Sequence, residues 1–188
     1  MWTRIGAVLL TVFLVASAQA RTIRIVAFGD SATYGWLVKR DDSYPAQLEK
    51  MLRAKGRDVS VTNAGIPGDT TKGALARLDG SVPNGTDIVL VEFGVNDLRM
   101  HVPQKAMRGN LSELVQRLCK RGIGVLVIGL GGLDVSDVAR ANNVLYVQWK
   151  LPPGQYRARD NAHFNAEGYA ILLARTLPQI ERLIAERR

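Results

Sequence analysis

The 188-residue chain has few of the residues that often staple a fold or hold a metal ion. Its single cysteine, Cys119, excludes a disulfide within the chain, and neighbours such as Leu114 and Leu118 predict a buried, unreactive thiol. The two histidines, His101 and His163, are far apart in the sequence and offer no ligand spacing for a metal ion. We therefore expect a fold held together by an apolar core, with no metal and no cofactor.

Basic runs longer than two residues are also absent, although the chain has a net charge of +8. The 25 Lys and Arg residues are scattered and aromatic residues are only 6% of the chain, which argues against a nucleic-acid groove. What remains is a solvated basic surface. Such a surface favours transient contact with an anionic partner, such as a membrane rich in acidic lipid.

The first twenty residues have the order of a secretory signal peptide. Arg4 precedes the apolar run Ile5–Val15, and the small residues Ala18-Gln19-Ala20 follow it. The run is shorter than the about 20 apolar residues that a membrane span needs, so cleavage is expected rather than a retained anchor. We expect a cleaved signal peptide over residues 1–20, a single domain over residues 21–188, and a periplasmic or secreted bacterial protein.

Short runs rich in Val and Ile alternate with amphipathic segments along the rest of the chain. Such runs are typical of strands that are buried on both faces, and their alternation with helices predicts a parallel sheet with helices on both sides. The expected fold is a three-layer α/β/α sandwich around a five-stranded parallel sheet. The predicted strands are Thr22–Phe28, Val59–Thr62, Ile88–Phe93, Val125–Leu130 and Val144–Trp149.

Three of the amphipathic segments predict long helices. Residues Tyr44–Lys55 and Gln104–Lys120 repeat apolar residues at helical spacing. The last helix begins after Asn165, a favourable N-cap residue, and Pro178 is expected to kink or divide it.

Polar residues follow the predicted strands at the points where the strands end. These clusters are Gly29-Asp30-Ser31, Asn63-Ala64-Gly65, Gly94-Val95-Asn96-Asp97 and, before the last helix, Asp160-Asn161-Ala162-His163. The carboxyl ends of parallel strands meet at one edge of a sheet, where such folds bind ligands. We therefore expect all four clusters on one rim.

Ser31 is the candidate nucleophile on this rim, since it stands at a strand-to-helix turn. Asp160 lies three residues before His163, a spacing that lets its carboxylate bind Nδ1–H of the imidazole and leaves Nε2 to accept the proton of Ser31. Taken singly, each residue also fits a structural role, Ser31 as a helix cap and His163 as a turn residue bonded to Asp160.

Two further loops offer donors for an oxyanion. The backbone N–H groups of Ser31 and Gly65 and the side-chain amide of Asn96 are expected to converge on one oxygen. Gly65 also fits a turn, and Asn96 also fits a helix cap. Asp30 and Asp97 are expected to accept loop N–H groups and to hold Ser31 and Asn96 in place.

Together these blocks resemble the SGNH, or GDSL, hydrolases over about Ile23–Leu177. The motifs are GDS with Ser31, NAG with Gly65, GVND with Asn96, and DNAH with Asp160 and His163. The resemblance implies a flavodoxin-like sandwich and hydrolysis through an acyl-Ser31 intermediate. It also implies that His163 is base and then acid and that Asp160 orients it.

The stretch NAGIPGDTTKGALARL, residues 63–78, is similar to exported bacterial acyl esterases that include thioesterase/lysophospholipase enzymes. Asn161 stands where such enzymes commonly have glycine, and the connection from Leu130 to Val144 is short, which implies less cover for a long acyl chain. Side chains expected near such a pocket are those of Trp36, Trp149, Leu151 and Tyr156.

The leading functional hypothesis is a serine esterase that cleaves carboxylic esters or thioesters of small acyl substrates, with water as second substrate. One alternative keeps the same site but has O-acetyl groups of extracytoplasmic polysaccharide as substrate. The other alternative is a non-catalytic module that binds a sugar or lipid.

Overall fold

The computed structural model describes residues 21–150 and 154–187. The predicted signal peptide and Leu151 lie outside the described residues. Five parallel strands form one sheet in the order β2-β1-β3-β4-β5, which confirms the predicted fold class. The strands are β1 (Ile23–Gly29), β2 (Val59–Gly65), β3 (Ile88–Glu92), β4 (Gly124–Leu130) and β5 (Leu145–Trp149).

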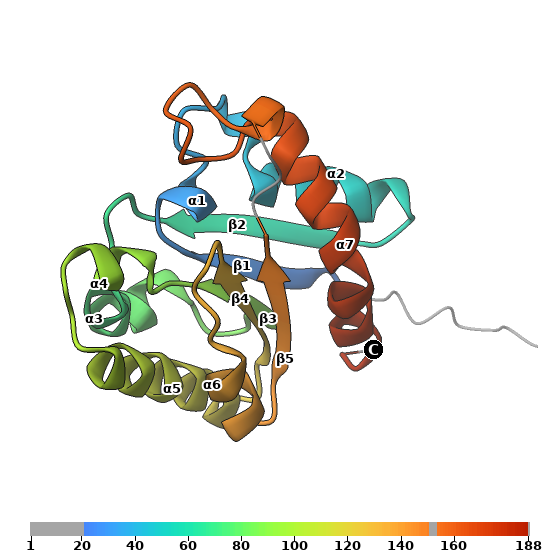
Figure 1. Cartoon of the computed structure of the whole chain (residues 1–188). Helices are drawn as coiled ribbons and strands as arrows, with labels where there is room; N and C mark the ends of the chain where they lie inside the picture. The colour runs from blue at the N-terminus through green and yellow to red at the C-terminus, as the bar shows by residue number, and fades with distance from the viewer. Residues whose placement is uncertain (1–20, 151–153, 188) are drawn as a thin grey trace, which may run out of the picture.

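Helices cover both faces of this sheet, with α2 and α7 on one side and α3, α5 and α6 on the other (Figure 1). The short helices α1 and α4 follow β1 and β3 at the carboxyl edge. None of the helices within the described ranges is long and apolar enough to cross a bilayer. The helices are α1 (Ser31–Tyr34), α2 (Tyr44–Ala54), α3 (Thr71–Ser81), α4 (Val95–Arg99), α5 (Gln104–Lys120), α6 (Ser136–Ala141) and α7 (Ala166–Ala185), with 3₁₀ turns η1 (Arg40–Asp42) and η2 (Gly154–Tyr156).

The apolar character of the strands follows from this double cover. Successive side chains of a strand point to opposite faces, so Ile25 and Ala27 of β1 join the core under α2 and α7, while Val26 and Phe28 join the core under α3 and α5. All four residues are at most 2% exposed.

The strand order also fixes where a ligand site can form. The chain passes from β1 to β2 on one side and then crosses to β3 on the other side of β1. The carboxyl ends of β1 and β3 therefore flank a topological switch point, the place where open α/β sheets bind ligands. Ser31 follows β1 and Asn96 follows β3, so the topology brings these two predicted residues to one crevice.

Strand β2 extends three residues beyond the predicted end, to Gly65. The added residues are Asn63, Ala64 and Gly65. Helix α1 packs closely against this end of the strand, since a Cβ on Gly65 would lie 2.2 Å from the backbone nitrogen of Tyr34. Gly65 pairs with Gly29 inside the sheet. The loop at the carboxyl edge therefore begins at Ile66, later than the sequence predicted.

Helix α7 continues through Pro178, so the chain is not divided there, one of the two outcomes that the sequence predicted. Both Pro178 and Ala174, the residue whose carbonyl loses a backbone donor, are exposed. The predicted burial of Cys119 was wrong. Cys119 is exposed, because Leu114 and Leu118 occupy the inner face of α5 and the next residue turns outward. Partial burial nevertheless raises the pKa of the Cys119 thiol.

Candidate active site

Ser31 begins α1 directly after β1 and is half-buried. Asp30 is the N-cap of this single helical turn, and its Oδ1 accepts the backbone N–H of Ala32 at 2.9 Å. The backbone N–H of Ser31 has no acceptor among the described residues, so it is available to a ligand.

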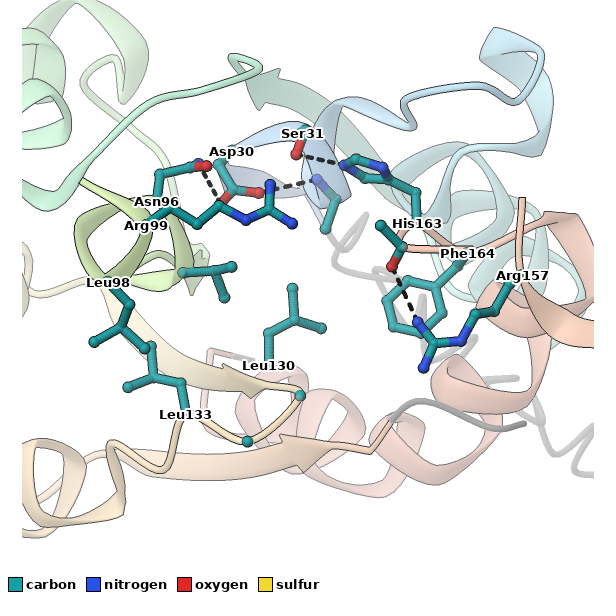
Figure 2. A pocket seen from close by; sticks show the side chains of 15 residues that line it. Asp30, Ser31, Asn96, Leu98, Arg99, Leu130, Leu133, Arg157, His163 and Phe164 are labelled. Carbon is teal, nitrogen blue, oxygen red and sulfur yellow. Dashed lines mark hydrogen bonds between the residues drawn. The ribbon is translucent and has the colours of Figure 1, made fainter. Parts of the chain in front are cut away.

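A hydrogen-bonded series joins Ser31 to His163, 132 positions later in the chain, and continues to Asp160; Figure 2 shows the contact between Ser31 and His163. The Oγ atom of Ser31 lies 2.8 Å from Nε2 of His163, and Nδ1 of His163 lies 2.6 Å from Oδ2 of Asp160. The other carboxylate oxygen of Asp160 accepts the backbone N–H groups of Ala162 and His163, each at 3.0 Å. The structure thus places these three predicted residues in contact.

The Asp160 carboxyl is held in its ionised form. Burial by itself would raise its pKa, but the N–H groups of His163 and Ala162 and the His163 ring hold the pKa of Asp160 well below its usual range. Asn161 has φ of 55°, a left-handed conformation that asparagine tolerates, so the tight turn forms without glycine. Arg157 closes the turn by donating from Nη1 to the Asn161 carbonyl at 2.9 Å.

This arrangement suits the activation of a hydroxyl. An ionised Asp160 binds the Nδ1–H tautomer of a neutral His163, which leaves the Nε2 lone pair facing the Ser31 hydroxyl. Proton transfer from Oγ to Nε2 generates a nucleophile at Ser31 and an imidazolium that Asp160 stabilises. The other histidine, His101, lies in the turn after α4, outside the cavity lined by Ser31 and His163.

Asn96 contacts the same site from α4 and is 6% exposed. Its Nδ2 donates to Oδ2 of Asp30 and to the carbonyl of Asp69, both at 2.9 Å. Both N–H groups of the Asn96 amide therefore already have an acceptor within the protein. A hydrogen bond to a substrate oxygen requires that one of these N–H groups be shared between two acceptors. Asp30 therefore anchors both the Ser31 turn and Asn96, as the sequence predicted for this residue.

Gly65 is not at this site, contrary to the prediction. Its N–H donates to Oδ1 of Asn63 at 3.0 Å, and it lines a separate hollow with Tyr34 and Arg40. The physical reason is that Gly65 is still inside the sheet.

Gly68 is the better candidate for a second backbone donor. It has φ of +81°, its N–H has no acceptor among the described residues, and it directly precedes Asp69, whose carbonyl binds Asn96. The Pro67-Gly68 pair is typical of a tight turn, and the N–H of Asp69 donates back to Ile66. The Pro67-Gly68 pair is visible in the sequence, but it marks the loop only once β2 is known to end at Gly65.

Arg77 of α3 holds this loop and was not identified from the sequence. It donates from Nε to Asp69 at 2.7 Å and from its terminal nitrogens to the carbonyls of Ala64 and Gly29. Its guanidinium also lies 4.4 Å from the centroid of the Phe28 ring. In the sequence, Arg77 is indistinguishable from a solvated arginine on a helix.

Asp97 of α4 holds the start of α3. Fully buried, it accepts the N–H of Thr71 at 2.9 Å and the Thr71 hydroxyl at 2.6 Å. Asp97 therefore joins α4 to α3, a scaffold role of the kind expected for it. Within residues 21–150 and 154–187, no group of three His, Cys, Asp or Glu side chains is arranged to hold a metal ion.

A cavity of about 380 Å³ opens beside Ser31 and His163. Most of its side chains are apolar, and Figure 2 shows Leu98, Leu130 and Leu133 facing the Ser31–His163 pair across it. Gly131 and Gly132 also line it, so the short Leu130–Val144 connection does contribute to the wall. The volume is at the small end of the range for ligand pockets.

The aromatic side chains predicted for the pocket lie elsewhere. Trp149 is 1% exposed and packs edge-on against Tyr44, with its indole N–H bound to Thr176. Trp36 is exposed at the surface, and neither it nor Tyr156 lines the cavity. Their positions depend on packing, which spacing in the sequence does not report.

Residues 27–149 match the GDSL-like Lipase/Acylhydrolase family, and the chain therefore belongs to this family. The match includes Ser31 and Asn96 and ends before Asp160 and His163. The contacts of Nε2 of His163 with Ser31 and of Nδ1 with Asp160 join those two residues to the site.

Three curated relatives are similar in sequence. The arylesterase of Vibrio mimicus is 33% identical over 117 residues, 62% of this chain and 58% of that protein. Esterase TesA of Pseudomonas aeruginosa is 32% identical over 63% of this chain and 59% of its own length. Thioesterase 1/protease 1/lysophospholipase L1 of Escherichia coli K12 is 36% identical over 80% of this chain and 61% of its own length. The chain thus matches about three-fifths of each relative.

Solved structures agree on the fold. The crystal structure of TesA has a TM-score of 0.78 at 24% identity and covers 85% of this chain and 99% of its own. AlinE4, described as an SGNH-hydrolase family esterase, has a TM-score of 0.70 at 27% identity and covers 88% of this chain and 98% of its own.

The placement of the two asparagines yields a test. Asn96→Ala should lower kcat for ester hydrolysis by about 10²–10³-fold with little change in KM, since an oxyanion donor acts mainly in the transition state. Asn63→Ala removes the acceptor of the Gly65 N–H and the donor to the Tyr34 carbonyl, and it should change kcat by less than about threefold. Steady-state kinetics and thermal unfolding of both variants would check this, and equal losses in folded proteins would place Asn63 and Gly65 back in the site.

Proposed function

We propose that this protein is a serine esterase that hydrolyses carboxylic esters or thioesters of small acyl substrates. The observation that carries the proposal is the hydrogen-bonded series Ser31–His163–Asp160 at the mouth of an apolar cavity. Family membership and the esterase and thioesterase names of the relatives support it.

In the proposed reaction, Oγ of Ser31 attacks the acyl carbon while its proton passes to Nε2 of His163. The carbonyl π electrons move to oxygen, where the N–H groups of Ser31, Gly68 and Asn96 bind the oxyanion. His163 returns the proton to the departing alcohol or thiol, which leaves an acyl-Ser31 ester. Water, deprotonated by His163, then attacks this ester, and His163 returns the proton to Oγ of Ser31 as the acyl–oxygen bond breaks and the acid leaves.

The protein is proposed to act in the periplasm or outside a bacterial cell, after cleavage following Ala20. The order of charge, apolar run and small residues in segment 1–20 supports this. N-terminal sequencing of the exported protein should give Arg21 as first residue, and an intact Met1 in the cytosolic fraction would contradict it.

Transient contact with an anionic lipid surface is also proposed. Within the described ranges, the large apolar side chains that are exposed all follow the carboxyl ends of β1, β2 and β3, and one of them, Leu98, lines the cavity. They are Tyr34, Trp36, Ile66, Leu98 and Met100. A basic chain that presents apolar side chains at one edge matches the chemistry of acidic lipid headgroups and the adjoining acyl chains.

The nucleophile can be tested directly. Ser31→Ala should reduce hydrolysis of p-nitrophenyl butyrate to background while the protein stays folded, because the proposed acyl intermediate forms on the Ser31 hydroxyl. A fluorophosphonate probe should label the wild-type protein and not this variant. Wild-type activity in Ser31→Ala would eliminate the mechanism, and a folded wild-type protein that neither hydrolyses esters nor reacts with the probe would favour a non-catalytic binding module.

The apolar cavity predicts a dependence on acyl length. Each methylene buried in it contributes about 0.8 kcal/mol, about fourfold in kcat/KM, until the cavity is full. The kcat/KM of p-nitrophenyl esters should therefore rise from acetate to butyrate and hexanoate. Leu98→Ser should flatten the rise. Highest kcat/KM for acetate, together with acetate release from acetylated glycans, would favour the polysaccharide O-acetyl esterase instead.

Vesicle binding tests the lipid contact. Wild-type protein should sediment with phosphatidylglycerol vesicles more than with phosphatidylcholine vesicles, and less as salt is raised from about 0.1 M to about 1 M. The double variant Trp36→Ser/Met100→Ser should lose this binding, whereas Lys120→Ser, at the opposite edge of the sheet, should keep most of it. Equal sedimentation of the double variant and wild type would contradict the proposed surface.

A further inference from the structure

Glu92 is a carboxyl group that the proposed reaction does not use. It is the last residue of β3, pairs with Gly29 of β1 and is 0% exposed. Glutamate is almost never fully buried unless it is paired. A carboxyl group buried directly beside the turn that carries Ser31 therefore calls for a physical reason.

The two oxygens of Glu92 have different surroundings. Oε2 accepts a hydrogen bond from the Thr33 hydroxyl at 3.1 Å. Oε1 has no hydrogen-bond partner among the described residues. Both the carboxyl and the backbone N–H of Asp30 lie close enough to the Glu92 side chain to shift its pKa. An ionised Glu92 would thus leave buried charge on Oε1 without a donor and next to a second carboxylate, which is strongly unfavourable.

Asp30 has a defined donor for each of its two carboxylate oxygens. Its Oδ1 accepts the N–H of Ala32 and its Oδ2 accepts Nδ2–H of Asn96, both at 2.9 Å. Two carboxyl groups in one buried site share a single negative charge, and the group with more donors retains it. The charge therefore belongs on Asp30 and the proton on Glu92.

The other titratable groups around the pair agree with this assignment. Burial raises the pKa of Tyr44 from α2 and of Tyr169 from α7, so both remain neutral hydroxyls. Burial raises the pKa of Asp30, whereas its hydrogen bonds with the Ala32 N–H and with Glu92, and the charge of Arg99, act in the opposite direction and favour its ionised form. Burial raises the pKa of Glu92 well above its usual value, and the charge of Asp30 raises it further.

We infer that Glu92 is a positioning residue: its neutral carboxyl donates a hydrogen bond from Oε1 to the Asp30 carboxylate and so fixes the contact between Asp30 and Asn96. The proton stays on Glu92, and no bond to substrate forms there. Without this donor, Asp30 is free to shift. The Asn96 amide and the first turn of α1, which both bind Asp30, would then shift as well. The catalytic consequence rests on the proposed esterase function, whereas the location of the proton does not.

Two substitutions at Glu92 distinguish the hydrogen bond that it donates to Asp30 from the space that its side chain fills. Glu92→Gln keeps a donor toward Asp30 and should retain kcat within about threefold, with KM unchanged. Glu92→Leu fills similar volume without a donor and should lower kcat by about 10- to 100-fold with little change in KM, since small displacements in an active site have effects of this order. Thr176→Val is the control for lost stability: it removes a buried hydroxyl that binds Trp149 and does not line the cavity, and it should leave kcat unchanged.

A pH series of thermal unfolding locates the proton independently of activity. Above about pH 4.5 the unfolded wild-type chain ionises Glu92, while the folded protein retains the proton. Unfolding then releases a proton, so rising pH lowers the stability of wild type. Glutamine does not titrate, and the Tm of Glu92→Gln minus that of wild type should therefore increase from pH 4.5 to about pH 8.

Each readout can overturn the inference. A constant difference in Tm across this pH range would show that Glu92 is ionised in the folded protein. Wild-type kcat in a folded Glu92→Leu variant, or equal losses in Glu92→Gln and Glu92→Leu, would show that no donated hydrogen bond positions Asp30. A wild-type protein without ester hydrolysis would instead contradict the proposed function, and the pH series would still test the proton.

Discussion

The buried carboxylate of Asp30 is the contact on which the geometry of the site depends. It caps the turn that begins with Ser31 and binds the Asn96 amide, so it fixes a residue that follows β1 relative to one that follows β3. A charge in this position is tolerable only because donors surround it. The rim is therefore a connected polar network resting on an apolar sheet rather than a set of independent loops.

Two further interactions extend this network to loops that are distant in the chain. Arg77 binds Asp69 and two strand-end carbonyls, which holds the loop containing Gly68 against the sheet. The other extension is the contact of His163 with Ser31, which ties the segment before α7 to the end of β1. Hydrolysis of an acyl substrate requires a nucleophile, a base and oxyanion donors at fixed distances, and the sheet supplies a rigid edge on which loops can meet this requirement.

The local pattern of the sequence was enough for the fold class and for most of the site. Apolar runs alternating with amphipathic segments fixed the parallel sheet, because only strands buried on both faces need such runs. Ser31, His163 and Asp160 were identified because side-chain chemistry and placement at strand ends both pointed to them. Gly65 was assigned in place of Gly68 because the small residues that extend β2 carry no apolar signal, and their strand conformation comes from contact with α1.

The sequence by itself thus determined which residues can carry the chemistry and that parallel strands bring them to one rim. Tertiary structure alone decided how they are arranged: that Trp149 belongs to the core, that Cys119 faces outward, and that Glu92 lies buried against Asp30. The physical reason is that residue type and periodicity report local preference. Burial, hydrogen-bond partners and shared protons depend on groups that are distant in the chain and meet only after folding.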